Sequence, residues 1–575
     1  MQAQQVNILD RKLWSSFWRI ARPYWSSDDK VRARALLLAL ALLLLGTTAL
    51  SVTISYAIRD LMTALSEKDI DAFKNSLWTC LGVFIIATPI STLFDYTRRL
   101  LSTFWREWLT RAFLDDYFSG RAYYNIGHAS DIDNPDQRIS QDVASFTSTS
   151  LDFLTEILAS LIQLIVFIGV LWSISQVLVY LLVAYAALGT IVVVIFGKKL
   201  INLNFLQLKR EADLRYGLVH VRNNVESIAF FGGEQREKAN IQNRLHQAIQ
   251  NFRNLIAWQK NLAYFTFGYQ YLIQILPIAI MTPLYFADEI KFGVVTQASG
   301  VFATVLASLT LIVTRIESLS QFAAGITRLQ TFKTALDSSQ TTKAEQPNGI
   351  ASVPESSRKI SLVELPKLAF QNVTIYTPKR ERKLLINASM EVPPSSGMII
   401  LGPSGSGKSS ILRVFSGLWN IGDGTVCRPP LADIFFLPQR PYMILGTLRD
   451  QLLYPLVNRD ITDLELAAVL ETVNLGNLVE RVGGLDITLP WAEMLSLGEQ
   501  QRLTFARLLL AKPRYAMLDE STSALDENNE SRLYDLLKDS GATYISVGHR
   551  QSLLKHHQTS LVLEGNGYWT CKALT

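Results

Sequence analysis

The chain has 575 residues, too many for one ordinary hydrophobic core, so we expect at least two domains. Its hydrophobic content of 49% is high for a soluble protein and is concentrated in the first part of the chain, which indicates a membrane protein. The net charge of +5 does not indicate nucleic acid as a partner, because Lys and Arg cluster between apolar segments and no basic face carries stacking aromatics.

Residues 13–25 place aromatic side chains and the cations Arg19 and Arg22 at helical spacing. Aromatic rings and basic groups are both satisfied in the headgroup layer of a bilayer. The segment therefore predicts an amphipathic helix that lies in the membrane interface. No short apolar run with a small-residue cleavage site precedes it, so we expect no cleavable signal peptide.

Six apolar segments follow, each long enough to cross a hydrocarbon core that needs roughly 20 helical residues. They are predicted at residues 36–58, 76–94, 154–174, 177–196, 265–285 and 294–313. The connections between spans two and three, and between four and five, are long and rich in Arg and Lys. This charge bias puts both long loops and both chain ends on the cytoplasmic side.

Apolar residues continue at helical spacing into the long loops, as at Phe104, Leu109 and Phe113, so the helices are expected to project into the cytoplasm. Glu156 is a carboxyl group near the start of the third span. A charge at mid-bilayer costs about 2.5–3.5 kcal/mol on insertion scales, so Glu156 is expected to face a partner or a wet cavity, or to lie at the cytoplasmic mouth. Its position near the start of the span favours the mouth.

The composition changes after the sixth span. Residues 336–361 are rich in Ser, Thr, Gln, Glu and Pro and cannot bury a core, which predicts a linker. The resulting division is a membrane domain at residues 1–335, the linker, and a second domain at residues 362–575.

A glycine-rich run in the second domain follows an apolar strand pattern and precedes a helix pattern, which is the setting of a phosphate-binding loop. Its backbone amides can turn onto phosphate oxygens, the Lys408 ammonium can reach the outer phosphates, and the Ser409 hydroxyl can bind Mg²⁺. The candidate ATP-binding residues here are Gly402, Pro403, Ser404, Gly405, Ser406, Gly407, Lys408, Ser409 and Ser410.

Three further strand patterns end in polar residues. The first is followed by Gln439, the second ends in Asp519 and Glu520, and the third is followed by His549. Ligands of such sheets collect at the carboxyl ends of the strands, so these groups are expected at one edge. Asp519 and Gln439 are candidates for holding Mg²⁺, Glu520 for polarising the attacking water, and His549 for reaching the γ-phosphate.

Residues 495–502 precede a helix rich in Leu and Ala, and with this run the sequence resembles an ABC transporter. The resemblance assigns residues 402–409 to Walker A, Gln439 to the Q-loop, Asp519 and Glu520 to Walker B, residues 523–526 to the D-loop and His549 to the switch. It implies that Ser496, Gly498 and Glu499 of the signature also bind ATP, and that Tyr376 stacks on adenine. Leu497 departs from the pattern, since most members have glycine there.

In the membrane half, residues 122–124, 134–143 and 224–234 resemble loop motifs of the peroxisomal fatty-acyl (subfamily D) half-transporters and of bacterial BacA-related transporters. The implied fold is an α-helical membrane domain of exporter type joined to an α/β P-loop nucleotide-binding domain. The implied coupling residues of the cytoplasmic loops are Asn134, Asp136, Gln137, Asp142, Glu226 and Gly232.

The resemblance implies an ATP-hydrolysing translocase that uses ATP and Mg²⁺. Because one chain carries one Walker A and one signature, we expect a homodimer with two composite sites. The expected substrate is amphipathic, fatty-acyl or lipid-like; the alternatives are an importer of bulky hydrophilic solutes such as cobalamin or peptides, and an ATP-gated channel or nucleotide sensor. The expected location is the bacterial inner membrane, with a plastid or peroxisomal membrane as the alternatives, and the nucleotide-binding domain is expected in the cytoplasm.

Overall fold

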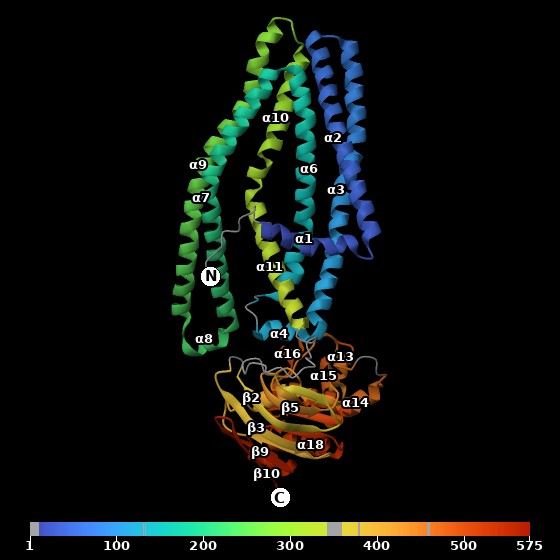
Figure 1. Cartoon of the computed structure of the whole chain (residues 1–575), viewed down its shortest axis with the longest axis vertical. Helices are drawn as coiled ribbons and strands as arrows, with labels where there is room; N and C mark the ends of the chain where they lie inside the picture. Colours follow the sequence, from blue (N-terminus) through green and yellow to red (C-terminus); the bar gives the residue numbers. More distant parts are fainter. Residues whose placement is uncertain are drawn as a thin grey trace, which may run out of the picture. The chain divides into compact units, whose positions relative to one another are not determined.

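The computed structural model describes residues 11–341 and 359–574, except for residues 130, 131, 133, 378, 379 and 457–459. The chain forms two compact units, Met1–Pro347 and Asn348–Thr575 (Figure 1). The first consists of helices and the second of strands and helices. Most of the predicted linker at residues 336–361 lies outside the described residues, and the last helix of the first unit runs to Thr341.

The first unit is built from long helices that match the apolar runs of the sequence. Three of them have 49, 48 and 53 residues. At 1.5 Å per residue these helices are roughly 70–80 Å long, more than twice the ~30 Å of a hydrocarbon core. The bounds are α1 Arg11–Ser26, α2 Lys30–Glu67, α3 Ile70–Phe118, α4 Ala122–Ala129, α5 Pro135–Gln137, α6 Val143–Ile174, α7 Gln176–Asn223, α8 Val225–Phe231, α9 Glu234–Phe286, α10 Phe292–Thr314 and α11 Ile316–Thr341.

Among the described residues, five helical segments are long and apolar enough to cross a membrane by length and composition. They include α2, α3, α6, α9 and most of α10, and they contain the predicted spans one, two, three, five and most of six. The predicted fourth span lies in α7, whose apolar stretch over the described residues, Gln176–Val192, is shorter. The six-span topology stays a prediction.

Helix α10 packs against α2, α6, α7 and α9, while α7 pairs along its length with α9 and α2 with α3 (Figure 1). One contact explains a glycine. A Cβ added to Gly293, near the start of α10, would lie 2.0 Å from the Arg59 carbonyl oxygen of α2. Only glycine lets these two backbones approach so closely.

Helix α1 has the two faces expected of an interfacial helix. Its buried side chains, Ile20, Ala21 and Tyr24, pack into a cluster with side chains of α2, α3, α6 and α11. Trp14 and Trp18 are 50% and 58% exposed on the other face. In Figure 1, α1 lies across the long helices, an orientation that suits a helix in the membrane interface.

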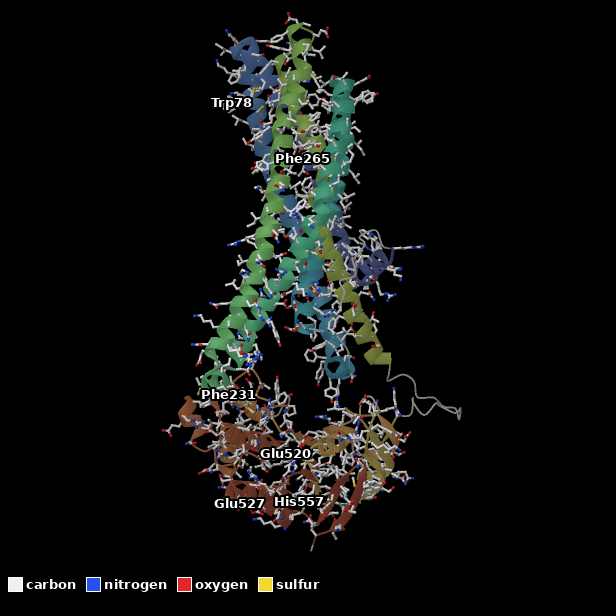
Figure 2. All side chains as sticks on the ribbon, turned by 90° about the vertical axis from the view of Figure 1, so that its left-hand side faces the viewer. Trp78, Phe231, Phe265, Glu520, Glu527 and His557 are labelled. Atoms are coloured by element: carbon white, nitrogen blue, oxygen red, sulfur yellow. The ribbon has the colours of Figure 1, made fainter. Side chains whose placement is uncertain are left out.

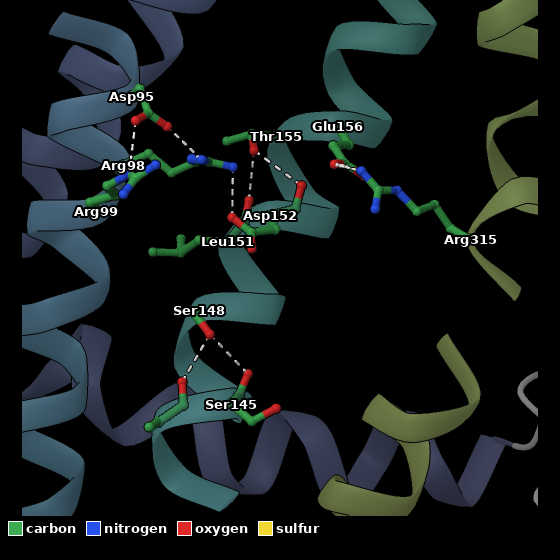
Figure 3. A network of polar contacts seen from close by, with 11 residues as sticks. Asp95, Arg98, Arg99, Ser145, Ser148, Leu151, Asp152, Thr155, Glu156 and Arg315 are labelled. Carbon is green, nitrogen blue, oxygen red and sulfur yellow. Dashed lines mark hydrogen bonds and ion pairs between the residues drawn. The ribbon is translucent and has the colours of Figure 1, made fainter. Parts of the chain in front are cut away.

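The carboxylates of α6 are paired with arginines from two other parts of the helical unit (Figure 3). Asp152 binds Arg98 of α3 at 2.6 Å, and Glu156, one turn further along, binds Arg315, between α10 and α11, at 2.6 Å. Arg98 also binds Asp95 of its own helix at 2.5 Å. The carboxylate of Glu156 therefore has a charged partner, one of the settings considered for it from the sequence.

The second unit contains two sheets. The strands are β1 Ser361–Glu364, β2 Leu368–Tyr376, β3 Lys383–Val392, β4 Gly397–Leu401, β5 Gly422–Arg428, β6 Ile434–Leu437, β7 Tyr515–Asp519, β8 Thr543–Val547, β9 Thr559–Gly565 and β10 Tyr568–Ala573. One sheet has the order β1-β5-β2-β3 and the other β10-β9-β4-β8-β7-β6. In the second, β4, β8, β7 and β6 are parallel neighbours, so their carboxyl ends meet at one edge.

Helices α12 Lys408–Phe415, α13 Leu448–Leu453, α14 Asp463–Thr472, α15 Leu478–Val482, α16 Trp491–Met494, α17 Leu497–Ala511 and α18 Glu527–Asp539 complete this unit. The parallel strands β4, β6, β7 and β8 of the larger sheet are mostly apolar, with β4 reading Gly-Met-Ile-Ile-Leu, because both faces of the sheet are covered there. Ile400 and Val547 pack with α12 in one core cluster, and Ala516 and Leu518 pack with α17 in the other.

His557, labelled in Figure 2, is buried in this unit between two tyrosine rings. Its Nδ1 donates to the Leu553 carbonyl oxygen at 2.7 Å, and its ring meets those of Tyr534 and Tyr544 edge-on. Burial lowers the pKa of His557 to about 4, an effect opposed by the Leu553 hydrogen bond and reinforced by the charge of His556. The folded protein therefore keeps this imidazole neutral.

The unfolded chain takes up a proton at His557 below pH 6.5, but the folded chain does so only below about pH 4. The free energy of unfolding is therefore expected to fall between pH 6.5 and 4, by about 3 kcal/mol in total from this group. Denaturation of the full chain at several pH values should show a shallower decline for His557→Gln than for the wild type. Equal declines would contradict the assignment.

Candidate nucleotide-binding site

The loop between β4 and α12 is shaped by glycines. Gly402, Gly405 and Gly407 have φ angles of 144°, 74° and 102°, a region that favours residues without a Cβ. At Gly402 a Cβ would also lie 2.6 Å from a backbone carbonyl oxygen, that of Leu563. These glycines therefore let the backbone between β4 and α12 make a tight turn before the helix begins at Lys408.

Lys408, the first residue of α12, has its side chain buried against this loop. Its Nζ donates to the carbonyl oxygens of Gly402 and Pro403, each at 2.9 Å. Burial lowers the pKa of Lys408, while the nearby Glu520 and Asp519 carboxylates raise it. The loop thus encloses a cation that can turn to an anionic ligand at the amino end of α12, where the helix dipole also favours negative charge.

Ser409 and Asp519 lie side by side at the base of the loop. The Ser409 hydroxyl donates to Asp519 Oδ1 at 2.9 Å. Burial raises the pKa of Asp519, and the Ser409 hydrogen bond opposes that rise. A hydroxyl and a carboxylate oxygen at this spacing are hard oxygen donors of the kind Mg²⁺ takes in phosphate-binding sites, so the pair fits a magnesium ion.

Glu520, labelled in Figure 2, is held from two sides. Gln439 Nε2 donates to Glu520 Oε2 at 2.8 Å, and His549 Nε2 lies 3.1 Å from Glu520 Oε1. The backbone of Glu520 is left-handed, with a φ of 45°, which costs a non-glycine residue about 1–3 kcal/mol. The ends of β6, β7 and β8 thus bring an amide, two carboxylates and an imidazole to one edge of the sheet.

Tyr376 ends β2 and is half-buried. Trp419 Nε1 donates to the Tyr376 carbonyl oxygen at 3.0 Å, and Arg380 and Lys383 lie 5.4 and 5.8 Å from the centre of its ring. Arg382 Nη2 donates to the Gly405 carbonyl oxygen at 2.6 Å. Sequence reasoning missed these three cations, because only the hairpin between β2 and β3 brings them to the tyrosine and the phosphate loop.

The signature residues open α17. Ser496 is the N-cap, and Ser496 and Glu499 form reciprocal hydrogen bonds that satisfy the first amides of the helix. Glu499 also binds Arg481 at 2.7 Å. Leu497, in place of the usual glycine, is 47% exposed, so its side chain does not disturb the packing of its own domain.

The structure does not bring the signature to the phosphate loop of the same chain by any polar contact. Among the described residues, no hydrogen bond or ion pair joins Ser496 or Glu499 to residues 402–410; their polar partners belong to α17 and to Arg481. The two predicted parts of the ATP site therefore share no hydrogen bond or ion pair through Ser496 or Glu499 in the part of the chain that the structure describes.

The predicted coupling residues have different environments. Asn134, Asp136, Gln137 and Glu226 are exposed, and Gly232 ends α8 with a φ of 62°. Asp142 differs from them, because its buried carboxylate accepts two hydrogen bonds from Arg328 of α11, at 2.8 and 2.6 Å. Asp142 thus joins the start of α6 to α11, and its coupling role stays a prediction.

Two family descriptions match this chain. Residues 20–286 match the ABC transporter transmembrane region 2, and residues 385–523 match the ABC transporter domain. The predicted architecture, a helical membrane domain with an α/β nucleotide-binding domain of exporter type, is confirmed by these matches together with a solved structure titled as a bacterial Atm1-family ABC exporter with ATP bound. That structure covers 93% of this chain and 94% of its own, with a TM-score of 0.70 at 20% identity, so it speaks to the fold alone.

Similar proteins extend over nearly the whole length. An uncharacterised ABC transporter ATP-binding protein of Synechocystis is 46% identical over 92% of this chain and 80% of its own. The chloroplastic ABC transporter D family member 2 of Arabidopsis thaliana is 40% identical over 96% and 86%. The human lysosomal cobalamin transporter ABCD4 is 32% identical over 98% and 96%.

Proposed function

The chain belongs to the subfamily D half-transporters of the ABC transporter family, and on that basis we propose that it moves an amphipathic, fatty-acyl or lipid-like molecule across a membrane as a homodimer. Family membership makes it an integral membrane protein that binds and hydrolyses ATP to drive translocation. The membrane that we propose is the bacterial inner membrane, with the nucleotide-binding domain in the cytoplasm.

The observation that carries the hydrolytic part is the position of Glu520 between Gln439 and His549. The Lys408 ammonium and the loop amides bind the β- and γ-phosphates, while Ser409, Asp519 and Gln439 would hold Mg²⁺, which would supply charge neutralisation at the phosphates. Glu520 then accepts a hydrogen bond from the water that attacks the γ-phosphorus, and the bond from that phosphorus to the ADP oxygen breaks. His549 orients Glu520 and can donate to the γ-phosphate.

The separation of signature and phosphate loop supports a composite site. The chain has one copy of each, and among the described residues no hydrogen bond or ion pair joins Ser496 or Glu499 to residues 402–410, as expected if the signature acts on the nucleotide of a second chain. In the proposed homodimer, the amino end of α17 of one chain faces the nucleotide bound on the other, where the positive end of the helix dipole stabilises phosphate charge.

The substrate proposal is supported by a cavity of about 250 Å³ among α7, α9 and α10. Its lining is mostly apolar, with a few hydroxyls and one amide: Gly189, Thr190, Phe265, Thr266, Tyr269, Gln270, Ile273, Ala303, Leu306, Ala307 and Thr310. The ring of Tyr269 stacks on Tyr185 at 4.1 Å between ring centres. Such a lining suits a hydrocarbon chain, with the polar groups fixing its orientation.

A bulky hydrophilic substrate remains the second candidate, because one relative is named as a cobalamin transporter. Glu156 was the charge considered for lining a water-filled cavity. Because its carboxylate is paired with Arg315, it is less able to bind a hydrophilic solute. Stimulation of the ATPase rate by candidate substrates distinguishes the two substrate classes.

Acylated amphiphiles such as acyl-coenzyme A are expected to raise the ATPase rate of the protein in lipid nanodiscs, while cobalamin and peptides are not. Filling the cavity by Ala307→Phe should reduce this stimulation, because the added ring takes space a hydrocarbon chain needs. Ala187→Phe is the matched control, since Ala187 is exposed on α7 and does not line the cavity. Stimulation by cobalamin alone, or equal effects of the two variants, would contradict the proposal.

A further inference from the structure

Arg550, the residue after His549, binds the turn that follows Glu520. Its Nη1 donates to the Leu525 carbonyl oxygen at 2.7 Å and its Nη2 to the Ser523 carbonyl oxygen at 2.8 Å. The turn is tied back to Glu520, because the Ser523 amide donates to the Glu520 carbonyl oxygen at 3.1 Å. One guanidinium thus joins the segment that carries His549 to the segment that carries Glu520.

A buried carboxylate lies under this contact. Glu530 of α18 is only 2% exposed and accepts hydrogen bonds from Thr522 at 2.7 Å and from Ser552 at 3.0 Å. Arg550 Nη1 lies 3.6 Å from Glu530 Oε1. Thr522 follows Glu520 and Ser552 follows His549, so Glu530 binds the same two segments that Arg550 joins.

The other side of the turn is held by the signature helix. Gln501 of α17 is buried; its Oε1 accepts from the Ala524 amide at 3.0 Å and its Nε2 donates to Ser523 Oγ at 3.2 Å. The turn at residues 522–526 is therefore fixed between Gln501 and Arg550.

We propose that Arg550 is a positioning residue for ATP hydrolysis, which sets the His549 imidazole against Glu520 by binding the 522–526 turn with both arms of its guanidinium. The proposal rests on the roles proposed above for Glu520 and His549. Arg550 and His549 are consecutive, with Cα atoms about 3.8 Å apart, so a shift of one moves the other. The proposal gives α17 a physical route to the hydrolytic residues of its own chain.

Arg550→Lys separates this role from plain charge neutralisation. Lysine keeps a positive charge beside Glu530 but cannot make the two-armed contact with both carbonyl oxygens. We expect kcat for ATP hydrolysis to fall about tenfold or more, because small misplacements of reacting groups are costly, while the KM for ATP and the Tm stay near the wild-type values. A wild-type kcat, or a kcat that falls only together with ATP affinity, would overturn the proposal.

Arg449→Lys is the matched control, since Arg449 is also bound to two groups, Asp463 and Asp486, but lies outside the hydrolytic residues. It should leave kcat unchanged. If Arg550→Lys does not fold, Glu530→Gln tests the support of this contact: it keeps the size of the side chain but removes the charge 3.6 Å from Arg550 Nη1 that holds the guanidinium in place, and an unchanged kcat would overturn the proposal. Loss of hydrolysis in Glu520→Gln with no effect of Arg550→Lys would refute this inference alone, whereas full activity of Glu520→Gln would refute the proposed function.

Discussion

Replacing Glu520 with glutamine is expected to lower kcat for ATP hydrolysis by about 10²- to 10⁴-fold, the usual contribution of a general base. The amide keeps the size of the carboxylate and can still accept the hydrogen bond from Gln439 Nε2. ATP binding should therefore persist, because the phosphate loop and Lys408 are unchanged. The result is measured as a steady-state ATPase rate beside the binding of labelled ATP.

Glu527 supplies the matched control. It lies at the start of α18, seven residues from Glu520, is exposed, and is labelled in Figure 2. Glu527→Gln removes the same charge without touching the candidate site, so its ATPase rate should equal that of the wild type. Normal hydrolysis in Glu520→Gln would remove Glu520 from the mechanism.

The same variant separates a pump from an ATP-gated channel or nucleotide sensor. In sealed vesicles, substrate flux is expected to stop together with hydrolysis in Glu520→Gln, because each transport cycle consumes ATP. Flux that continues at the wild-type rate while ATP is bound but not hydrolysed would favour the channel.

Much of the nucleotide-binding domain could be predicted because its determinants are local. Strand patterns that end in polar residues, and the glycines at 402, 405 and 407, define where β4, β6, β7 and β8 stop. Parallel order then brings the residues after these strands to one edge. The proximity of Gln439, Glu520 and His549 could thus be expected, although their chemical roles stay predictions.

Partners that are distant in the chain could not be predicted. Glu156 is paired with Arg315, 159 residues away, and Asp142 with Arg328, 186 residues away. Hydropathy and helical spacing say which face of a helix is polar, but they do not say which other helix supplies the opposite charge. For the same reason the sequence placed Asp142 in a cytoplasmic loop but did not predict that its carboxylate is buried.

The switch segment gives a second example. His549 was recognised by its place after a strand, but the role inferred for Arg550 depends on two carbonyl oxygens, those of Ser523 and Leu525. Every residue has a backbone carbonyl oxygen, so the sequence does not indicate which of these oxygens accept a hydrogen bond from Arg550. The proposed substrate cavity could not be predicted from the sequence either, because its lining residues come from three separate helices, α7, α9 and α10.

The central claim is that each ATP site is shared between two chains, and two lesions test it. Lys408→Ala removes the phosphate-binding cation. Ser496→Asp keeps a side-chain oxygen that can cap α17 but sets a carboxylate against the partner's phosphates. Each lesion is expected to lower the rate of ATP hydrolysis at a site that contains it by about 10²-fold or more. Losses of this size are usual when a single group that stabilises the transition state is removed.

Heterodimers carrying these lesions can be purified with two different tags in two arrangements. In the trans pair, one chain has Lys408→Ala and the other Ser496→Asp, which leaves one shared site with neither lesion. In the cis pair, one chain has both lesions and the other is wild type, so each shared site has one lesion. Shared sites predict that the trans pair hydrolyses ATP at least about tenfold faster than the cis pair. An active cis pair beside an inactive trans pair would show that each chain completes its own site, and would contradict the account.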